Sequence, residues 1–332
     1  MLHYTKRIAP ILIWMYSLIN ISACIRDDIR CNLPVTIGLD YSYNILNTNM
    51  LDEKSDRAAL HIFDQEGVLV IQRDIGDGIG ELSLPALKPG KYHFVAHARS
   101  TDVISEWADL YVPRLTEKVS GIEKLTAYLK RSDNGVQNNR LNDFLIGYTI
   151  SDIDANIGNR VQISLKSAVK RIRITLLPTT GGVLLDPDRY NFKITDNVGN
   201  GHIKYDYTQL PDEAIIYKPY YKTASSPDTP TENEVSSAVM AEINSTRLIE
   251  QNRPYLTISD NSNNREIVRV NLTWLLSLTN MENNKGRWSL QEYLDRQDNF
   301  AITLFVDTAT GSWLKSTIII NGWVLNMEDI DF

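Results

Sequence analysis

Residues 161–176 read VQISLKSAVKRIRITL. Apolar and polar side chains alternate in two parts of this stretch, at residues 161–165 and again at residues 172–176. Successive side chains of a β-strand point to opposite faces, so each part predicts a strand with one face in a core and one in water. The stretch therefore favours a β-rich fold.

The same character extends in both directions along the chain. Asp64–Gly67 separates two short apolar runs and is typical of a hairpin turn. Short strands separated by turns at intervals of about 8–12 residues indicate a β-sandwich rather than alternating strands and helices. The predicted strands are residues 35–43, 60–63, 68–71, 81–84, 91–98 and 144–150 before this stretch, and 190–195, 214–217, 267–272, 300–306 and 316–325 after it.

Two helices are expected to interrupt the strands. Residues 121–131 place Ile122, Leu125 and Leu129 at helical spacing. Ser289, with a glutamate three residues later, is a candidate capping box at the start of a helix over residues 289–296. Asp, Asn and Gly cluster at residues 152–159, and we place a domain boundary there, between residues 35–158 and 159–332.

The N-terminus has the features of a secretory signal peptide. Residues 1–7 contain two basic side chains and no acidic one, and a mostly apolar run follows to Ile21. That run is shorter than the roughly 20 apolar residues that a transmembrane helix needs. Residues 1–23 are therefore predicted to direct export and then to be removed.

Ile21-Ser22-Ala23-Cys24 is typical of a lipobox, in which the peptidase cuts between Ala23 and Cys24 after the cysteine thiol has been lipidated. Acyl chains on Cys24, palmitate among them, would tether the mature chain to a membrane. The alternative is an ordinary signal peptide with a cysteine near its end. In the lipoprotein interpretation, residues 24–34 form the lipidated linker, and Cys31 is either a small buried thiol or a partner for another chain.

Two acidic residues lie within four positions after the cysteine, in Arg26-Asp27-Asp28. They resemble the surface-export signal of Bacteroidetes lipoproteins, which implies display on the outer face of the outer membrane. The alternative is a solvated polar linker without a sorting role.

Composition excludes nucleic acid as the partner. The 332-residue chain has a formal charge of −7, and removal of residues 1–23 takes away two basic side chains. Phosphate binding needs clustered Lys and Arg, which an acidic chain does not supply. A hydrophobic content of 43% is ample for packed cores.

The sequence offers no constellation that predicts catalysis, a metal or a cofactor. His93 and His97 would share one face of a strand about 13 Å apart, too far to bind one ion. Residues 196–202 are rich in Asp, Asn and Gly but lack the calcium-loop spacing, so a tight turn is favoured. Two carboxylates brought together by the fold remain possible in principle, but nothing selects such a pair, and we expect no enzymatic activity.

Several segments together resemble a known family. The N-terminus around Cys24 and Cys31 is similar to that of the fimbrillin-associated anchor proteins of Bacteroidetes, the FimB-like family. The other resembling segments are Leu84–Tyr92 in the first predicted domain, Leu165–Ile174 at the entry to the second, and Tyr293–Ile302, Trp313 and Ile318–Trp323 in the last third.

This resemblance implies an all-β protein of two tandem transthyretin-like Greek-key β-sandwich domains with short helical insertions. It also implies a lipoprotein of the outer membrane that anchors a fimbrial shaft, and limits its length, through strand exchange with fimbrillin subunits. The alternative function is a surface adhesin or glycan-binding module. Ile318, Ile320 and Trp323 are interpreted either as knobs of a donor strand or, preferably, as core residues of the last strand.

Overall fold

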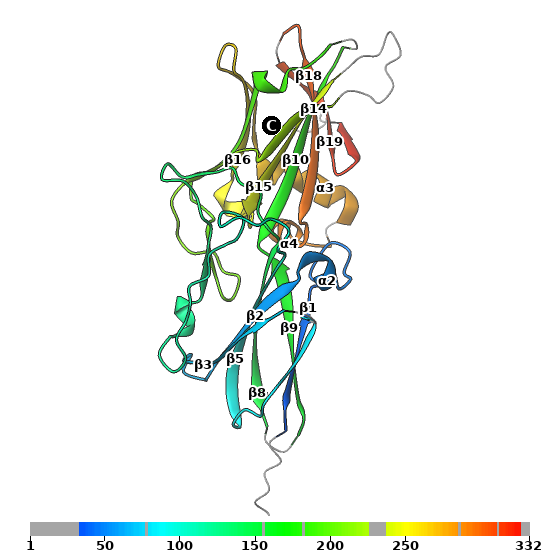
Figure 1. The fold of residues 1–332 in the computed structure, drawn as a ribbon. Coiled ribbons are helices and arrows are strands. Elements are labelled where there is room, and N and C mark those ends of the chain that lie inside the picture. The colour runs from blue at the N-terminus through cyan, green and yellow to red at the C-terminus, as the bar shows by residue number, and fades with distance from the viewer. Residues whose placement is uncertain are drawn as a thin grey trace, which may run out of the picture.

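The computed structural model describes residues 33–76, 79–154, 157–180, 183–225, 237–284, 287–310 and 312–326. Figure 1 shows an elongated molecule in which two strand-rich halves lie end to end. Within the described residues the structure is mostly β, and the predicted fold class is confirmed at that level. The first half holds β1 to β5, β8 and β9, and the second half holds β10 to β20, while β6 and β7 belong to the connecting segment described below.

A seven-stranded sheet forms the first half, in the order β3-β2-β5-β8-β9-β1-β4. The sheet folds over at β8 and β9, where Gly147 lies so close to Ile163 and Leu165 that a methyl group would collide with them. The two wings enclose a core that includes Leu60, Phe94 and Ile163. The strands are β1 (Val35–Asp40), β2 (Arg57–Phe63), β3 (Leu69–Ile75), β4 (Glu81–Leu84), β5 (Gly90–Arg99), β8 (Phe144–Ile153) and β9 (Asn159–Ser167).

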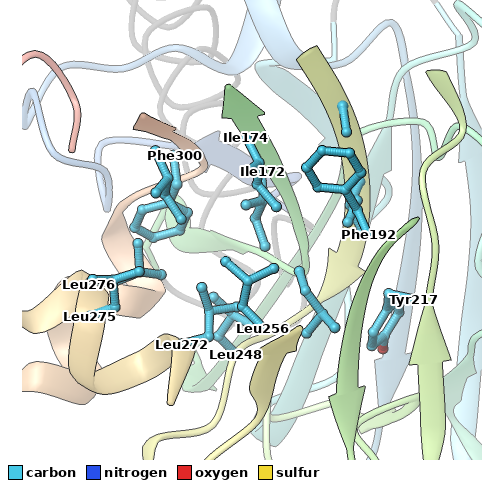
Figure 2. Packing of buried hydrophobic residues seen from close by; sticks show 14 of the residues in the cluster. Ile172, Ile174, Phe192, Tyr217, Leu248, Leu256, Leu272, Leu275, Leu276 and Phe300 are labelled. Carbon is cyan, nitrogen blue, oxygen red and sulfur yellow. The ribbon is translucent and has the colours of Figure 1, made fainter. Parts of the chain in front are cut away.

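A six-stranded and a five-stranded sheet face each other in the second half, ordered β14-β15-β10-β18-β19-β20 and β17-β16-β11-β13-β7. Figure 2 shows Ile172 and Ile174 of one sheet and Phe192 of the other pointing into their shared core. The strands are β10 (Val169–Pro178), β11 (Tyr190–Asp196), β12 (His202–Lys204), β13 (Ile215–Tyr217), β14 (Tyr221–Ser225), β15 (Ala238–Thr246), β16 (Tyr255–Asp260), β17 (Arg265–Asn271), β18 (Asn299–Asp307), β19 (Ser312–Ile320) and β20 (Trp323–Asn326).

Two of the helices belong to the second half. α3 (Leu272–Asn284) places Leu275 and Leu276 in the same core (Figure 2), and α4 (Leu290–Arg296) begins at Ser289. The Ser289 side chain accepts a hydrogen bond from the Glu292 amide, which confirms the predicted N-terminus of α4. The remaining short helices are α2 (Leu51–Lys54), η2 (Ile122–Lys124), η3 (Pro187–Arg189) and η4 (Glu250–Asn252).

Residues 100–142, which we call the strap, join the two halves along one side of the molecule (Figure 1). The Leu69 amide at the start of β3 donates to the Ser120 carbonyl. Further on, β6 (Thr126–Tyr128) pairs with β12, and β7 (Val136–Gln137) pairs with β13. The helix predicted over residues 121–131 is wrong. The structure has one 3-10 turn at residues 122–124, followed by the strand β6. The reason is that Leu125 and Leu129 are buried in two different hydrophobic clusters.

The domain boundary expected between residues 158 and 159 does not follow the sheets. β9 begins at Asn159 and pairs in parallel with β1, so it belongs to the first half. The chain passes from the first half to the second at Ala168, between β9 and β10. β8 ends at Ile153 and β9 begins at Asn159, so the cluster of Asp, Asn and Gly instead falls between two strands of the first half. Likewise, the strand expected over residues 316–325 is a hairpin of β19 and β20, with Asn321 and Gly322 at positive φ in its turn.

Candidate functional site

The predicted processing and sorting residues Ala23, Cys24, Arg26, Asp27 and Asp28 lie outside the described residues, as does Cys31. The first described element is β1, which starts at Val35. In Figure 1, β1 begins at the far end of the first half, away from the second half. A tether attached just before β1 would therefore leave the second half pointing away from the attachment point.

β1 is the element on which the strand-exchange hypothesis depends, because it already pairs with a strand on each side. It pairs in parallel with β9 from Val35 to Asp40 and antiparallel with β4 from Val35 to Gly38. Its inward side chains Val35, Ile37 and Leu39 are almost completely buried. Burial of an aliphatic side chain contributes roughly 1.5–3 kcal/mol. Loss of β1 would therefore remove several kcal/mol of stabilisation and open an apolar groove between β9 and β4.

A buried polar cluster holds the end of β1 against the second half. The Tyr41 hydroxyl donates to Asp298 Oδ2 at 2.5 Å, and Lys54 Nζ lies 3.4 Å from the same oxygen. Lys170, which is fully buried at the start of β10, lies with Nζ 3.6 Å from Asp298 Oδ1 and donates to the Asp295 carbonyl at 2.8 Å. Burial, partly offset by Asp298, lowers the pKa of Lys170, and burial beside Asp298 raises the pKa of Tyr41.

A second group of contacts crosses the junction a short distance away. The Arg296 guanidinium lies 4.0 Å from the centroid of the Tyr43 ring, and the Tyr207 hydroxyl donates to the Ser167 carbonyl at 2.6 Å. Arg247 lies over Tyr207 and forms a bidentate pair with Asp295, with both N–O distances below 2.9 Å. Together with the strap, these contacts fix one half of the molecule against the other.

Strand edges are the surfaces that can pair with a partner strand. In the described part of the chain, β3 and β4 end the first sheet, and β14 and β20 end the six-stranded sheet. The strap covers the start of β3 through the bonds to Leu69. Ile318 and Ile320 on β19 are fully buried in the second core, which agrees with the core interpretation of these residues. The side chain of Trp323 lies outside the described residues.

Two grooves open on the second half. One, of about 650 Å³, lies on the outward face of the six-stranded sheet and includes Arg140, Arg173, Tyr220 and Glu242 in its lining. The other, of about 470 Å³, lies beside α3 and includes Arg253, Arg269 and Trp274. Neither groove was anticipated, because their residues come from segments far apart in the sequence.

The histidines have neighbours that spacing alone did not reveal. His97 of β5 is buried and lies 5.7 Å, centroid to centroid, from the ring of His61 on β2. Burial lowers the pKa of His61 to about 4, and burial together with His61 lowers that of His97 to about 3. His93 instead stacks on Tyr148. Among the described residues, no group of three or more His, Cys, Asp or Glu side chains is placed to hold a metal ion.

The segment at residues 196–202 forms the expected tight turn. Asp196 Oδ1 accepts hydrogen bonds from the amides of Val198 and Gly199, and Gly199 has a φ of 83°. The same carboxylate also accepts from the Asn252 side chain. Its oxygens are therefore used to hold the turn and η4 together. In the described part of the chain, no helix is both long and apolar enough to cross a membrane.

Comparison with known proteins places these features in a family. The model of the fimbrillin-A associated anchor proteins Mfa1 and Mfa2 matches residues 27–329. No curated protein matches the sequence.

Three solved structures are similar in fold. A Bacteroides thetaiotaomicron protein, provisionally described as polysaccharide-binding, is 26% identical, with 90% of this chain and 99% of that chain covered and a TM-score of 0.75. A provisional adhesin from the same organism is 22% identical, with 89% and 97% covered and a TM-score of 0.76. The fimbrial anchor protein Mfa2 of Porphyromonas gingivalis is 16% identical, with 88% and 98% covered and a TM-score of 0.63.

Proposed function

The chain belongs to the family of fimbrillin-A associated anchor proteins, and from this membership we propose that it anchors a fimbrial shaft at the outer membrane. Lipid on Cys24 would hold the chain in the membrane, and the acidic residues after it would direct the chain to the cell surface. Its role is mechanical rather than catalytic. We further propose that the two halves are transthyretin-like Greek-key sandwiches, which is the architecture that the resemblance implies.

The seated strand β1 is the observation that carries this proposal. In assembly by strand exchange, a subunit accepts a neighbour's strand only when a place in its own sheet is vacant. Here β1 fills that place, with pairing on both sides and with Val35, Ile37 and Leu39 in the core. A chain that keeps β1 offers the next subunit no groove in the first sheet. It would therefore end the shaft and limit its length.

The shape of the molecule supports the same role. The start of β1 lies at the end remote from the second half (Figure 1), so the second half would project from the membrane toward the shaft. The strap and the polar cluster around Asp298 would transmit force between the halves without a flexible hinge. We place the contact with fimbrillin on the second half, where β14 and β20 end the six-stranded sheet. Main-chain hydrogen bonds at such an edge give affinity for an added strand.

The anchoring role is tested by the position of the fimbriae in a Cys24→Ala strain. We expect shafts in the culture medium, or abnormally long shafts, while cells with the native chain retain them. Cys31→Ala is the matched control, since it removes the only other cysteine and leaves the lipobox intact. Unchanged attachment and length in the Cys24→Ala strain would reject the anchoring role.

A second experiment tests whether β1 blocks strand exchange. A protease site placed in the loop at residues 44–48, between β1 and α2, would allow β1 to be cut from the purified mature chain and removed under mild denaturant. We expect the cut chain to bind a synthetic peptide of β1, or a fimbrillin donor strand, while the uncut chain binds neither. Binding of the fimbrillin strand by the uncut chain, in the first sheet, would contradict the proposal.

A surface adhesin or glycan-binding module is the second candidate function. The arginine- and tyrosine-lined groove on the six-stranded sheet favours it, because such side chains suit sugar binding. Two of the similar structures also have provisional descriptions of this kind. This function would leave fimbrial attachment unchanged in the Cys24→Ala strain.

A further inference from the structure

The groove on the outward face of the six-stranded sheet has a chemistry that differs from the rest of the chain. Three arginines, at positions 140, 171 and 173, line it together with a single acidic side chain, Glu242. Arg173 is paired with Glu242 and Arg171 with Asp143, so Arg140 leaves the groove with a net positive charge on a chain whose formal charge is −7. A concave positive surface concentrates anionic ligands.

Part of the groove is a fixed hydrogen-bonded framework. Arg173 donates from Nε and Nη2 to Glu242 Oε1 at 2.9 and 2.6 Å, and the Tyr220 hydroxyl donates to Glu242 Oε2 at 2.7 Å. Burial opposes ionisation of Glu242, but the bonds from Tyr220 and Arg173 outweigh it and lower the pKa of Glu242. Burial and the same carboxylate raise the pKa of Tyr220 to about 12. Near neutral pH the framework therefore keeps one carboxylate and one neutral hydroxyl in fixed positions.

Other groups in the groove are available to a ligand. Arg140 is exposed and has no hydrogen bond or ion pair to any residue that the structure describes. Its charge nevertheless acts on both Tyr220 and Glu242, which places it near the framework. Tyr221 is 49% exposed and presents an aromatic side chain at the start of β14. Arg171, by contrast, is not available: Nη2 donates to Asp143, and Nε is buried.

The large apolar residues of the groove are not open to a partner, and its exposed apolar residue, Ala301, carries only a methyl group. Ile172 and Phe300 line it, but both side chains are buried in the core between the two sheets (Figure 2). The groove therefore lacks the apolar sockets that anchor a peptide or a protein hot spot. Guanidinium and carboxylate groups with a flanking tyrosine instead match a ring that carries hydroxyls, an apolar C–H face and a negative charge.

We propose that this groove binds a carboxylated saccharide. Arg140 pairs with the sugar carboxylate, the Arg173–Glu242–Tyr220 framework bonds to ring hydroxyls, and Tyr221 packs on the C–H face of a pyranose. The site supplies a ligand class for the adhesin function and does not depend on anchoring. A purified chain tests it, so its failure is separable from a failure of the anchoring role.

Binding is measured by isothermal titration calorimetry with the full mature chain carrying Cys24→Ser. The probes are tetragalacturonate, a hyaluronan tetrasaccharide and sialyllactose, and the neutral control is lactose. We expect at least one acidic probe to bind and lactose to bind about tenfold more weakly or not at all, since the charge-assisted bond to Arg140 is missing. Absence of binding by all three acidic probes would overturn the proposal.

Two variants locate the site. Arg140→Gln should weaken binding of the acidic probe about tenfold or more, because the charge-assisted hydrogen bond to the sugar carboxylate is lost. Tyr221→Ser should weaken binding of the acidic probe by several-fold, because the ring that packs on the pyranose is lost. Arg57→Gln is the matched control: it removes an exposed arginine from the first sheet and should leave binding unchanged. Equal loss with Arg140→Gln and Arg57→Gln, or no loss with either, would show that the groove is not the site.

Discussion

At the scale of single residues, the most unusual feature is a lysine without solvent exposure. Lys170 ends in a pocket formed by Asp298 and the Asp295 carbonyl, while Lys54 and Tyr41 contact the other oxygen of Asp298. A buried ion pair adds little net stability, because desolvation offsets the attraction. It does enforce one geometry, since any other arrangement leaves a charge unpaired. We interpret the cluster as the device that fixes the angle between the two halves.

This interpretation predicts a large cost for Asp298→Ala. The variant leaves Lys170 buried without its carboxylate, and breaking a buried pair in this way costs about 3–5 kcal/mol. The exposed pair Arg160–Glu81 provides the control, and Glu81→Gln should cost less than about 1 kcal/mol. Urea denaturation of the mature chain measures both free energies of unfolding. If Asp298→Ala costs no more than Glu81→Gln, the cluster does not hold the junction.

The two buried histidines predict a dependence of stability on pH. Folding lowers the pKa values of His61 and His97 to about 4 and about 3, so the folded chain favours their neutral forms. Their contribution is therefore fully present above the unfolded value of about 6.5 and is lost as the pH falls below it, by up to about 1.4 kcal/mol per pH unit for each group.

We therefore expect His97→Leu to flatten the loss of stability between about pH 6.5 and pH 4 that the native chain shows in urea denaturation. Asp74, the charged group that acts on His61, remains in place in this variant. An identical slope in the native chain and His97→Leu would contradict the assignment.

At the scale of elements, strands were predictable where one face is buried and the other is exposed to solvent. β9, β10 and β18 show alternating burial, and their sequences alternate in the same way. The strap was not predictable, because Leu125 and Leu129 face two different cores and only resemble a helical stripe. α3 was missed because the expected strand over residues 267–272 runs directly into it. Asn271, whose side chain accepts from the Trp274 amide at the start of α3, was interpreted as a residue of that strand.

The candidate site was less accessible to sequence reasoning than the fold. The seated position of β1 depends on pairing with β9, more than a hundred residues away in the chain. The groove needs Arg140, Arg173 and Glu242 to meet, and these lie on three separate segments. Local spacing carries no information about such encounters. By contrast, the Asp196 turn and the Ser289 cap involve bonds between residues two or three apart, and both were predicted.

Because the first sheet folds over at β8 and β9, we can make a prediction about β8. A Cβ atom at Gly147 would lie 2.7 Å from carbons of Ile163 and Leu165 and 2.8 Å from the Ser164 carbonyl oxygen. We expect Gly147→Ala to destabilise the chain by about 1–3 kcal/mol, because overpacking at a backbone contact forces the strands apart. Gly80→Ala, where a Cβ meets nothing within 4 Å, should change stability by less than about 0.5 kcal/mol. Equal thermal midpoints for the two variants would refute the close approach of β8 and β9.

At the scale of the whole molecule, the two halves share more than a covalent link. Phe144 and Ile146 of β8 belong to the same core as the second half. The strap is hydrogen-bonded to Leu69 of β3 in the first half and pairs with β12 and β13 of the second half. Pulling on a shaft attached to the second half would therefore load the junction and the first sheet together. This continuity is what an anchor requires, since a flexible joint would be the weakest point under tension.

Continuity of the core predicts that the chain unfolds in one step. In differential scanning calorimetry, the van't Hoff and calorimetric enthalpies of the native mature chain should agree.

The double variant Tyr41→Phe with Tyr43→Ala removes the hydroxyl bond to Asp298 and the ring beneath Arg296, which are two of the contacts across the junction. We expect its transition to broaden or split, because each half retains most of its own core. Tyr111→Ala, at a half-exposed tyrosine of the strap, is the control and should keep a single transition. Two transitions in the native chain would show that the halves are independent, and a single sharp transition in the double variant would show that the strap alone couples them.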